Sequence, residues 1–354
     1  MKPQKFLFIA ASIAAMNLLA SANAAKANIY LLATGGTIAG TADSSTNMTG
    51  YTPGQLAVQA LLKSVPSVVE VANVTGEQVA NIGSESMTDD VWLKLARRIN
   101  ELLARRDVDG IVVTHGTDTM DETAYFLNLV VKSDKPVVMV GAMRPATAIS
   151  ADGPANIYNA IKLASSKDAV GKGVMIAMND TISGAREATK TNTLRVDTFK
   201  NQELGYMGYF EDGEPVFYHQ STRRHTKNTE FDISELRELP RVDIIYSHVN
   251  DDGKMALSAV ANGAKGIIHA GTGNGSLHMQ THLTLTEIAK EGKVKVVRSS
   301  RVPYGPTIKS YPGWDEVGMI QSGTLSPQKA RVLLQLALTK TNDAKEIQKM
   351  FRIY

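Results

Sequence analysis

The segment N-I-Y-L-L-A at residues 28–33, followed by T-G-G-T at 34–37, sets the pattern of the whole chain. Its apolar run has the length of a buried strand, and the glycine pair ends it in a tight loop. Similar short runs recur downstream, separated by longer segments with apolar residues at helical spacing. The expected strands are 28–33, 77–82, 110–114, 136–140 and 173–178, and the expected helices are 54–65, 91–105, 118–131 and 153–165. This alternation predicts a mostly parallel sheet.

A polar, charged stretch at residues 211–240 interrupts this pattern, as a connector between domains would. The alternation then resumes, with expected strands at 242–247, 265–270 and 294–298 and helices at 328–338 and from about 343. A chain of 354 residues is long enough for two domains. We therefore predict an α/β fold with two open doubly wound domains. A larger N-terminal domain with a flavodoxin-like parallel sheet is expected at 25–218, a linker at 219–240 and a smaller C-terminal domain at 241–354.

The first 24 residues have the composition of an export signal. Two lysines precede an apolar run at 6–15, and the small residues S-A-N-A follow at 21–24. This order predicts a secretory signal peptide at 1–24 and a periplasmic protein. The alternative, a membrane anchor, is disfavoured because the apolar run is short and contains Ser12.

The charge and cysteine content exclude several classes of protein. The formal net charge is +3, and removal of the predicted signal peptide with its two lysines leaves +1. So small a charge disfavours a nucleic-acid partner, and we expect no membrane partner either. The chain has no cysteine, which rules out disulfides, cysteine-bound metals and thiol catalysis.

Three loops at expected strand ends are rich in hydroxyls, glycines and acids. They are T-G-G-T-I-A-G at 34–40, G-S-E-S at 83–86 and H-G-T-D-T at 115–119. Ligands of such sheets bind beyond the carboxyl ends of the strands, so the loops converge if the first strand lies between the second and third. The glycines of the first loop could hold a phosphate, but the loop lacks both G-x-G-x-x-G and G-K-[ST].

Two of these segments, A-T-G-G-T-I-A at 33–39 and T-H-G-T-D-T at 114–119, resemble the signature motifs of the bacterial L-asparaginase family. The resemblance continues through G-A-M-R-P at 141–145, S-A-D-G-P at 150–154, T-K-T-N at 189–192 and P-Q-K-A-R at 327–331. With the export signal, the pattern is similar to the type II branch. It implies hydrolysis of the side-chain amide of L-asparagine without a metal or other cofactor. It also implies a homotetramer made of two close dimers.

The resemblance assigns catalytic roles to five residues. Thr37 is the nucleophile and Tyr51 assists it, while Thr117, Asp118 and Lys190 form a second group on the other side of the substrate. A free hydroxyl needs a positioned base to attack an amide, so the residue types suit the reaction. The residues alone leave open which threonine attacks first.

For substrate binding, the resemblance points to Ser84, Glu85, Thr117 and Asp118, which would hold the α-carboxylate and α-ammonium of an amino acid. Each residue also has an ordinary alternative. Ser84 and Thr117 could be turn residues, Tyr51 a loop anchor and a single lysine a solvated surface group. The small, polar segment at 40–51 is expected to close over the substrate as a lid.

Two positions differ from the asparagine-selective pattern of the family. Glu85 replaces a glutamine, and Ser276 replaces the last asparagine of a G-N-G-N motif, as in the glutaminase-asparaginase subgroup. A pocket discriminates one methylene by only ~1–3 kcal/mol, so we expect glutamine to be a substrate too. The family also takes a carboxylate from a neighbouring subunit, and Asp315 and Glu316 are both open candidates.

A periplasmic amino-acid binding protein without catalysis is the alternative interpretation, since it shares two α/β lobes and an export signal. Thr37 and Lys190 favour the enzyme, because binding alone requires neither. His278 and His282 are four residues apart but lack the H-E-x-x-H pattern, so we expect no zinc.

Overall fold

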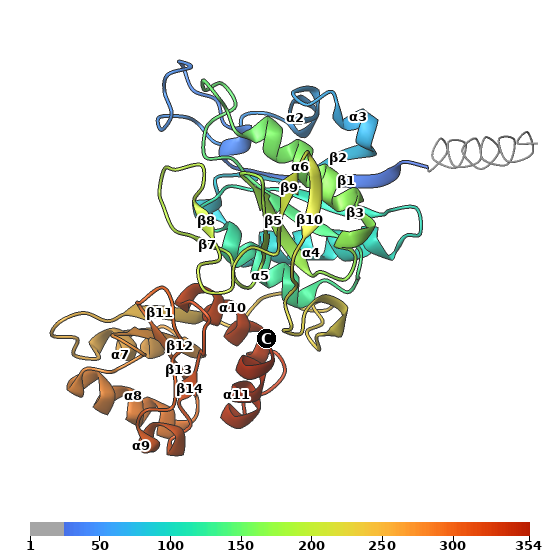
Figure 1. The fold of residues 1–354 in the computed structure, drawn as a ribbon. Coiled ribbons are helices and arrows are strands. Elements are labelled where there is room, and N and C mark those ends of the chain that lie inside the picture. Colours follow the sequence, from blue (N-terminus) through green and yellow to red (C-terminus); the bar gives the residue numbers. More distant parts are fainter. Residues whose placement is uncertain (1–24) are drawn as a thin grey trace, which may run out of the picture.

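The computed structural model describes residues 25–354, so the predicted signal peptide lies outside the described part. Five parallel strands form one side of a large sheet, in the order β2-β1-β3-β4-β5 from its edge inward. Figure 1 shows this sheet as the core of the N-terminal part of the chain. The five strands are β1 (Ala27–Gly35), β2 (Ala72–Ile82), β3 (Gly110–Thr114), β4 (Val137–Val140) and β5 (Val174–Met178). This order is the flavodoxin-like one, and it confirms the predicted fold class. The first strand lies between the second and third, as the convergence of the three loops requires.

The sheet is mixed rather than wholly parallel, because three antiparallel strands extend it beyond β5. They are β6 (Thr181–Gly184), β9 (Gly208–Glu211) and β10 (Glu214–Phe217). Two-residue turns connect β5 to β6 and β9 to β10, and both turn residues have positive φ in each case, as in type I′ hairpins: Asn179 and Asp180, then Asp212 and Gly213. A separate two-stranded ribbon pairs β7 (Thr189–Lys190) with β8 (Phe199–Lys200).

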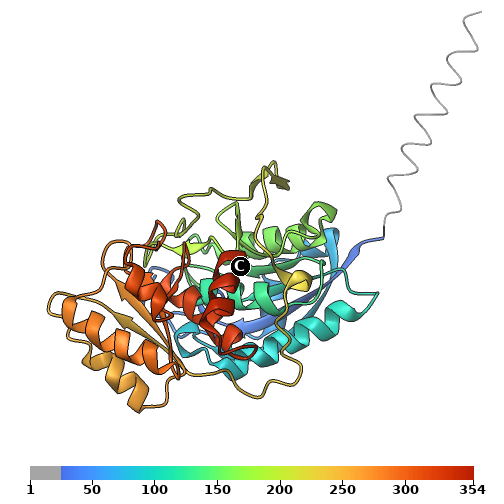
Figure 2. The same ribbon diagram turned by 90° about the horizontal axis from the view of Figure 1, so that it is seen from below.

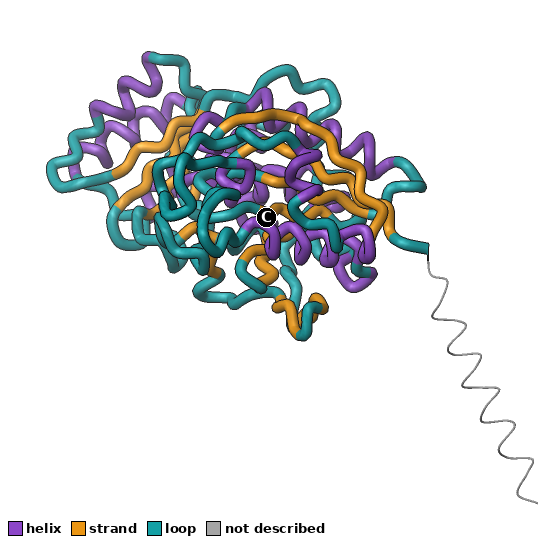
Figure 3. The backbone as a smooth tube through the Cα atoms, turned by 90° about the horizontal axis from the view of Figure 1, so that it is seen from above, coloured by secondary structure: helices purple, strands orange, loops and turns teal. Residues whose placement is uncertain are grey.

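Helices cover both faces of the large sheet (Figures 2 and 3). Alternate residues of β1 divide between two hydrophobic clusters: Leu31 packs on one face and Leu32 on the other. The first cluster includes helices α2 (Val58–Lys63), α3 (Val68–Val71) and α6 (Gly153–Ser165), and the second includes α4 (Asp89–Ala104) and α5 (Met120–Val130). Burial on both faces explains why the central strands are continuously apolar.

The C-terminal sheet is small and parallel, with strand order β11-β12-β13-β14. One face packs on α7, α8 and α9, and the other on α10 and α11, and α10 also contacts α5 of the large domain (Figure 1). The bounds are β11 (Val242–Tyr246), β12 (Gly266–Gly271), β13 (Lys295–Ser300), β14 (Ile320–Gln321), α7 (Lys254–Ala261), α8 (Met279–Glu291), α9 (Pro312–Glu316), α10 (Pro327–Leu338) and α11 (Ala344–Ile353). The two domains therefore share one hydrophobic cluster.

The segment between the sheets packs against the large domain. Phe231 is fully buried, and the Thr229 hydroxyl donates to the carbonyl of Leu129 at 2.5 Å. The predicted bounds of the linker stay a prediction. Within residues 25–354, no helix combines the length and apolar character needed to cross a membrane.

Candidate active site

The three polar loops meet at one edge of the large sheet, where β1, β2 and β3 end. Gly35 and Gly36 both have positive φ, and they turn the chain from β1 into the short helix η1 (Thr37–Ala39). A Cβ at Gly36 would lie 2.3 Å from the backbone nitrogen of Gly116, so the first and third loops are in direct backbone contact. Only glycine permits both this conformation and this approach.

Thr37 forms one pair of hydroxyl groups with Tyr51. The Thr37 side chain is buried, and its Oγ1 lies 2.6 Å from the Tyr51 hydroxyl. An antiparallel bridge between Thr41 and Thr52 positions Tyr51, because it closes the loop of chain that connects Thr37 to Tyr51. This segment also rests on a neighbouring loop, where the amide of Ile149 donates to the carbonyl of Ser45 at 2.8 Å.

A second group brings together Lys190, Thr117 and Asp118. The ammonium of Lys190 donates to Thr117 Oγ1 at 2.9 Å and to Asp118 Oδ1 at 2.5 Å. The Lys190 side chain is only 16% exposed, whereas that of Asp118 is 59% exposed and faces the outside. A pocket beside this group is lined by Asp118, Lys190 and residues 191–193.

Ser84 connects the second loop to the third. Its buried hydroxyl accepts from the Asp118 amide at 3.1 Å, and its carbonyl accepts from the Thr119 hydroxyl at 2.8 Å. Glu85, the next residue, is exposed at the same edge. The predicted site residues therefore form two groups. Hydrogen bonds connect Ser84, Asp118, Thr117 and Lys190 in one group, and Thr37 and Tyr51 form the other. The backbone contact between Gly36 and Gly116 lies between the two groups.

The His115 side chain connects the third loop to helix α5. Its buried ring lies with Nδ1 2.6 Å from the carbonyl of Gly116 and Nε2 3.0 Å from Thr123 Oγ1. A carbonyl can only accept, so Nδ1 carries the proton and Nε2 accepts from the threonine. Burial lowers the pKa of His115 to about 4. The hydrogen bond to Gly116 favours the charged form and opposes this shift, but burial is the larger effect. The ring is therefore neutral near pH 7.

The remaining candidates lie in the small domain. The Ser276 hydroxyl is 3.5 Å from Asn274 Oδ1 in the loop after β12. Asp315 is paired with Lys309 at 3.0 Å and accepts from the side-chain amide of Gln321 at 2.9 Å. These contacts are internal to the small domain and do not bring either candidate to the edge that carries Thr37.

The structure also shows a residue that the sequence analysis did not single out. Lys329, at the start of α10, is fully buried and donates to the carbonyls of Arg186 and Ala188, which precede Lys190 in the chain. The sequence signal was a lysine inside P-Q-K-A-R-V-L-L at 327–334, where helical spacing places position 329 next to the apolar residues.

Comparisons with known proteins match most of the described chain. Residues 28–223 match the family "Asparaginase, N-terminal", and residues 241–351 match "Glutaminase/Asparaginase C-terminal domain". The chain is 52% identical over 328 residues to L-asparaginase 2 of Escherichia coli, covering 92% of this chain and 93% of that protein. It is 44% identical to a glutaminase-asparaginase of Pseudomonas aeruginosa, with all of both chains covered.

A solved structure is similar throughout. The crystal structure described as "Probable Cytoplasmic L-asparaginase from Campylobacter jejuni" superposes with a TM-score of 0.91 at 51% identity, and the match covers 93% of this chain and 100% of that one. The fold and these relatives together define a two-domain α/β amidohydrolase. The chain belongs to the asparaginase family.

Proposed function

We propose that this protein hydrolyses the side-chain amide of L-asparagine, and also of L-glutamine, to the acid and ammonia, with Thr37 as nucleophile. The observation that carries the proposal is the Lys190 ammonium, which lies within hydrogen-bond distance of both Thr117 and Asp118 at the edge where Thr37 meets Tyr51. Names of relatives such as L-asparaginase 2 and glutaminase-asparaginase support the choice of substrates.

In the proposed reaction, Thr37 Oγ1 attacks the amide carbon and gives its proton to the Tyr51 oxygen at 2.6 Å, while Tyr51 passes its own hydroxyl proton on toward the amide nitrogen. The amide nitrogen takes up a proton and leaves as ammonia, which produces an acyl-enzyme ester. Water then adds to the ester carbon, and cleavage of the bond to Thr37 Oγ1 releases the acid and restores the hydroxyl. Thr117, held by Lys190, is placed to assist proton transfer, and backbone N–H groups around it would stabilise the oxyanion.

Four residues are proposed to bind the amino-acid part of the substrate. The hydroxyls of Ser84 and Thr117 suit the α-carboxylate, whereas the carboxylates of Asp118 and Glu85 suit the α-ammonium. Glu85 and Ser276 also support comparable use of asparagine and glutamine. Values of kcat/KM that differ by a factor of hundreds between the two amides would contradict this part of the proposal.

We further propose an exported, periplasmic homotetramer. The relative described as "Probable L-asparaginase periplasmic" in Haemophilus influenzae supports export, although the Campylobacter jejuni relative carries a cytoplasmic description. Assembly is supported by large apolar side chains that the small domain exposes, among them Val249 at 85%, Met279 at 66% and Tyr246 at 61%.

The test is ammonia release by the purified protein with each amide. Thr37→Ala should abolish release, because the attacking oxygen is lost while the helix-compatible Ala keeps the backbone of η1. A urea unfolding curve like that of the wild type shows that the variant is folded. Absence of ammonia from the wild-type protein would refute the proposed function, and full activity of the folded variant would refute the role of Thr37.

A further inference from the structure

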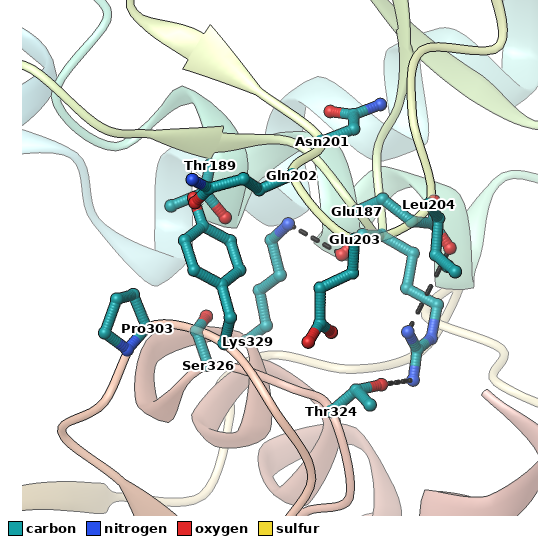
Figure 4. Close-up of a pocket in the computed structure, with 12 residues that line it drawn as sticks. Glu187, Thr189, Asn201, Gln202, Glu203, Leu204, Pro303, Thr324, Ser326 and Lys329 are labelled. Atoms are coloured by element: carbon teal, nitrogen blue, oxygen red, sulfur yellow. Dashed lines mark hydrogen bonds and ion pairs between the residues drawn. The ribbon is translucent and has the colours of Figure 1, made fainter.

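Lys329 is a charged residue in the middle of the contact between the two domains. Its side chain is 2% exposed, and it comes from the first turn of α10 in the small domain (Figure 4). Its ammonium donates to the carbonyl of Arg186 at 2.8 Å and to that of Ala188 at 2.5 Å. Burying an ammonium without partners is costly, so these bonds account for its position. Lys329 thus connects the small domain to one short segment of the large domain.

The segment that Lys329 holds ends at Lys190. Residues 185–188 follow β6, and the next two residues form β7, which among residues 25–354 pairs only with the equally short β8. Such a ribbon supplies little support of its own. The ammonium of Lys190 must nevertheless reach Thr117 and Asp118, which stand on a different strand end. The segment therefore depends on contacts from outside its own sheet.

The small domain supplies four such hydrogen bonds. Besides the two bonds from Lys329, the guanidinium of Arg186 donates to the carbonyl of Tyr354 at 2.6 Å and to Thr324 Oγ1 at 3.1 Å. Burial lowers the pKa of Lys329 to about 8, while attraction from Asp121 and Glu187 opposes the shift. The side chain therefore stays mostly protonated at neutral pH and keeps its donors.

We propose that Lys329 is a positioning residue of the reaction: by holding the carbonyls of Arg186 and Ala188, it fixes the backbone that presents Lys190 to Thr117 and Asp118. The inference rests on the proposed function. On this proposal, the small domain supports the active site of its own chain. It does so through Lys329, which contacts neither the substrate nor any reacting atom.

The decisive variant is Lys329→Met, which keeps the length of the side chain and removes the donors. We expect kcat to fall ~10- to 100-fold with KM changed less than about threefold, because small displacements of a reacting group cost rate rather than binding. Lys329→Arg should recover most of the loss, since its guanidinium retains donors and a cavity of about 80 Å³ beside Lys329 offers space.

Gln335→Met is the matched control. Gln335 is fully buried on the same helix and also bonds across to the large domain, through Asp89 at 3.2 Å, but it does not contact the segment before Lys190. It should lose stability with kcat within about twofold of the wild type. If Lys329→Met fails to fold, the double variant Lys329→Met with Asp121→Asn avoids leaving a buried carboxylate without its counter-ion, and it should show the same loss of kcat.

Three results would overturn the inference. They are a folded Lys329→Met or double variant with kcat within about twofold of the wild type, an equal loss in Gln335→Met, and no recovery in Lys329→Arg. A wild-type protein that releases no ammonia would instead refute the proposed function, so the two failures are distinguishable.

Discussion

The buried imidazole of His115 predicts a specific loss of stability in acid. Its pKa falls from an ordinary value of 6.5 to about 4 because the ring is buried. In the unfolded chain the ring takes up a proton near pH 6.5, whereas in the folded protein it stays neutral down to about pH 4. Between these values the unfolded state binds more protons, so stability falls as the pH falls. From pH 7.5 to pH 4.5 this group should remove about 2.5 kcal/mol from the free energy of unfolding.

The assay is urea unfolding of the wild type and of His115→Gln at several values between pH 7.5 and pH 4.5. The variant has its own stability at pH 7.5, so the compared quantity is the change with pH. All other titrating groups are shared, and we expect the variant to lose about 2.5 kcal/mol less than the wild type over this range. His219→Gln, which removes an exposed imidazole, serves as control and should follow the wild type. Equal losses in His115→Gln and the wild type would refute the assignment of a neutral, buried ring.

Two further changes test the geometry around Thr37. Tyr51→Phe removes the hydroxyl that lies 2.6 Å from Thr37 Oγ1, and kcat for ammonia release should fall roughly 100-fold with little change in KM; an unchanged kcat would exclude Tyr51 from proton transfer. Gly36→Ala places a Cβ 2.3 Å from the backbone nitrogen of Gly116 at a φ of 84°. It should lower both the free energy of unfolding, measured in urea, and the rate of ammonia release, and wild-type values of both would show that the two loops do not touch.

The central part of the fold follows directly from the sequence. Short apolar runs such as 110–114 and 136–140 correspond to β3 and β4, because strands buried on both faces have no polar alternation. The strands beyond β5 were missed. Their evidence lay in the turn pairs Asn179-Asp180 and Asp212-Gly213, which favour two-residue hairpins, but the strands beside them are only four residues long. The hairpins make the sheet mixed, with antiparallel strands added to the mostly parallel sheet that the βαβ pattern predicted.

The sequence predicts where the site lies, but it does not predict the side-chain contacts within the site. The topology alone brings the ends of β1, β2 and β3 together. Contacts such as Lys190 with Thr117 join residues 73 positions apart through irregular segments, so no local pattern encodes them. Their roles came from family resemblance. Lys329 escaped notice because a single lysine on a helix is usually exposed, and its burial depends on the packing of two domains.

The contact between Gly36 and Gly116 has a consequence for the order of folding events. The two glycines are far apart in the chain, so their loops can meet only after β1 and β3 have paired in register, and such long-range parallel pairing is slow. Collapsed intermediates that lack this pairing should already contain helices while having no assembled nucleophile. Recovery of hydrolysis during refolding would therefore lag behind recovery of the helical circular dichroism signal. The delay would report when β1 pairs with β3.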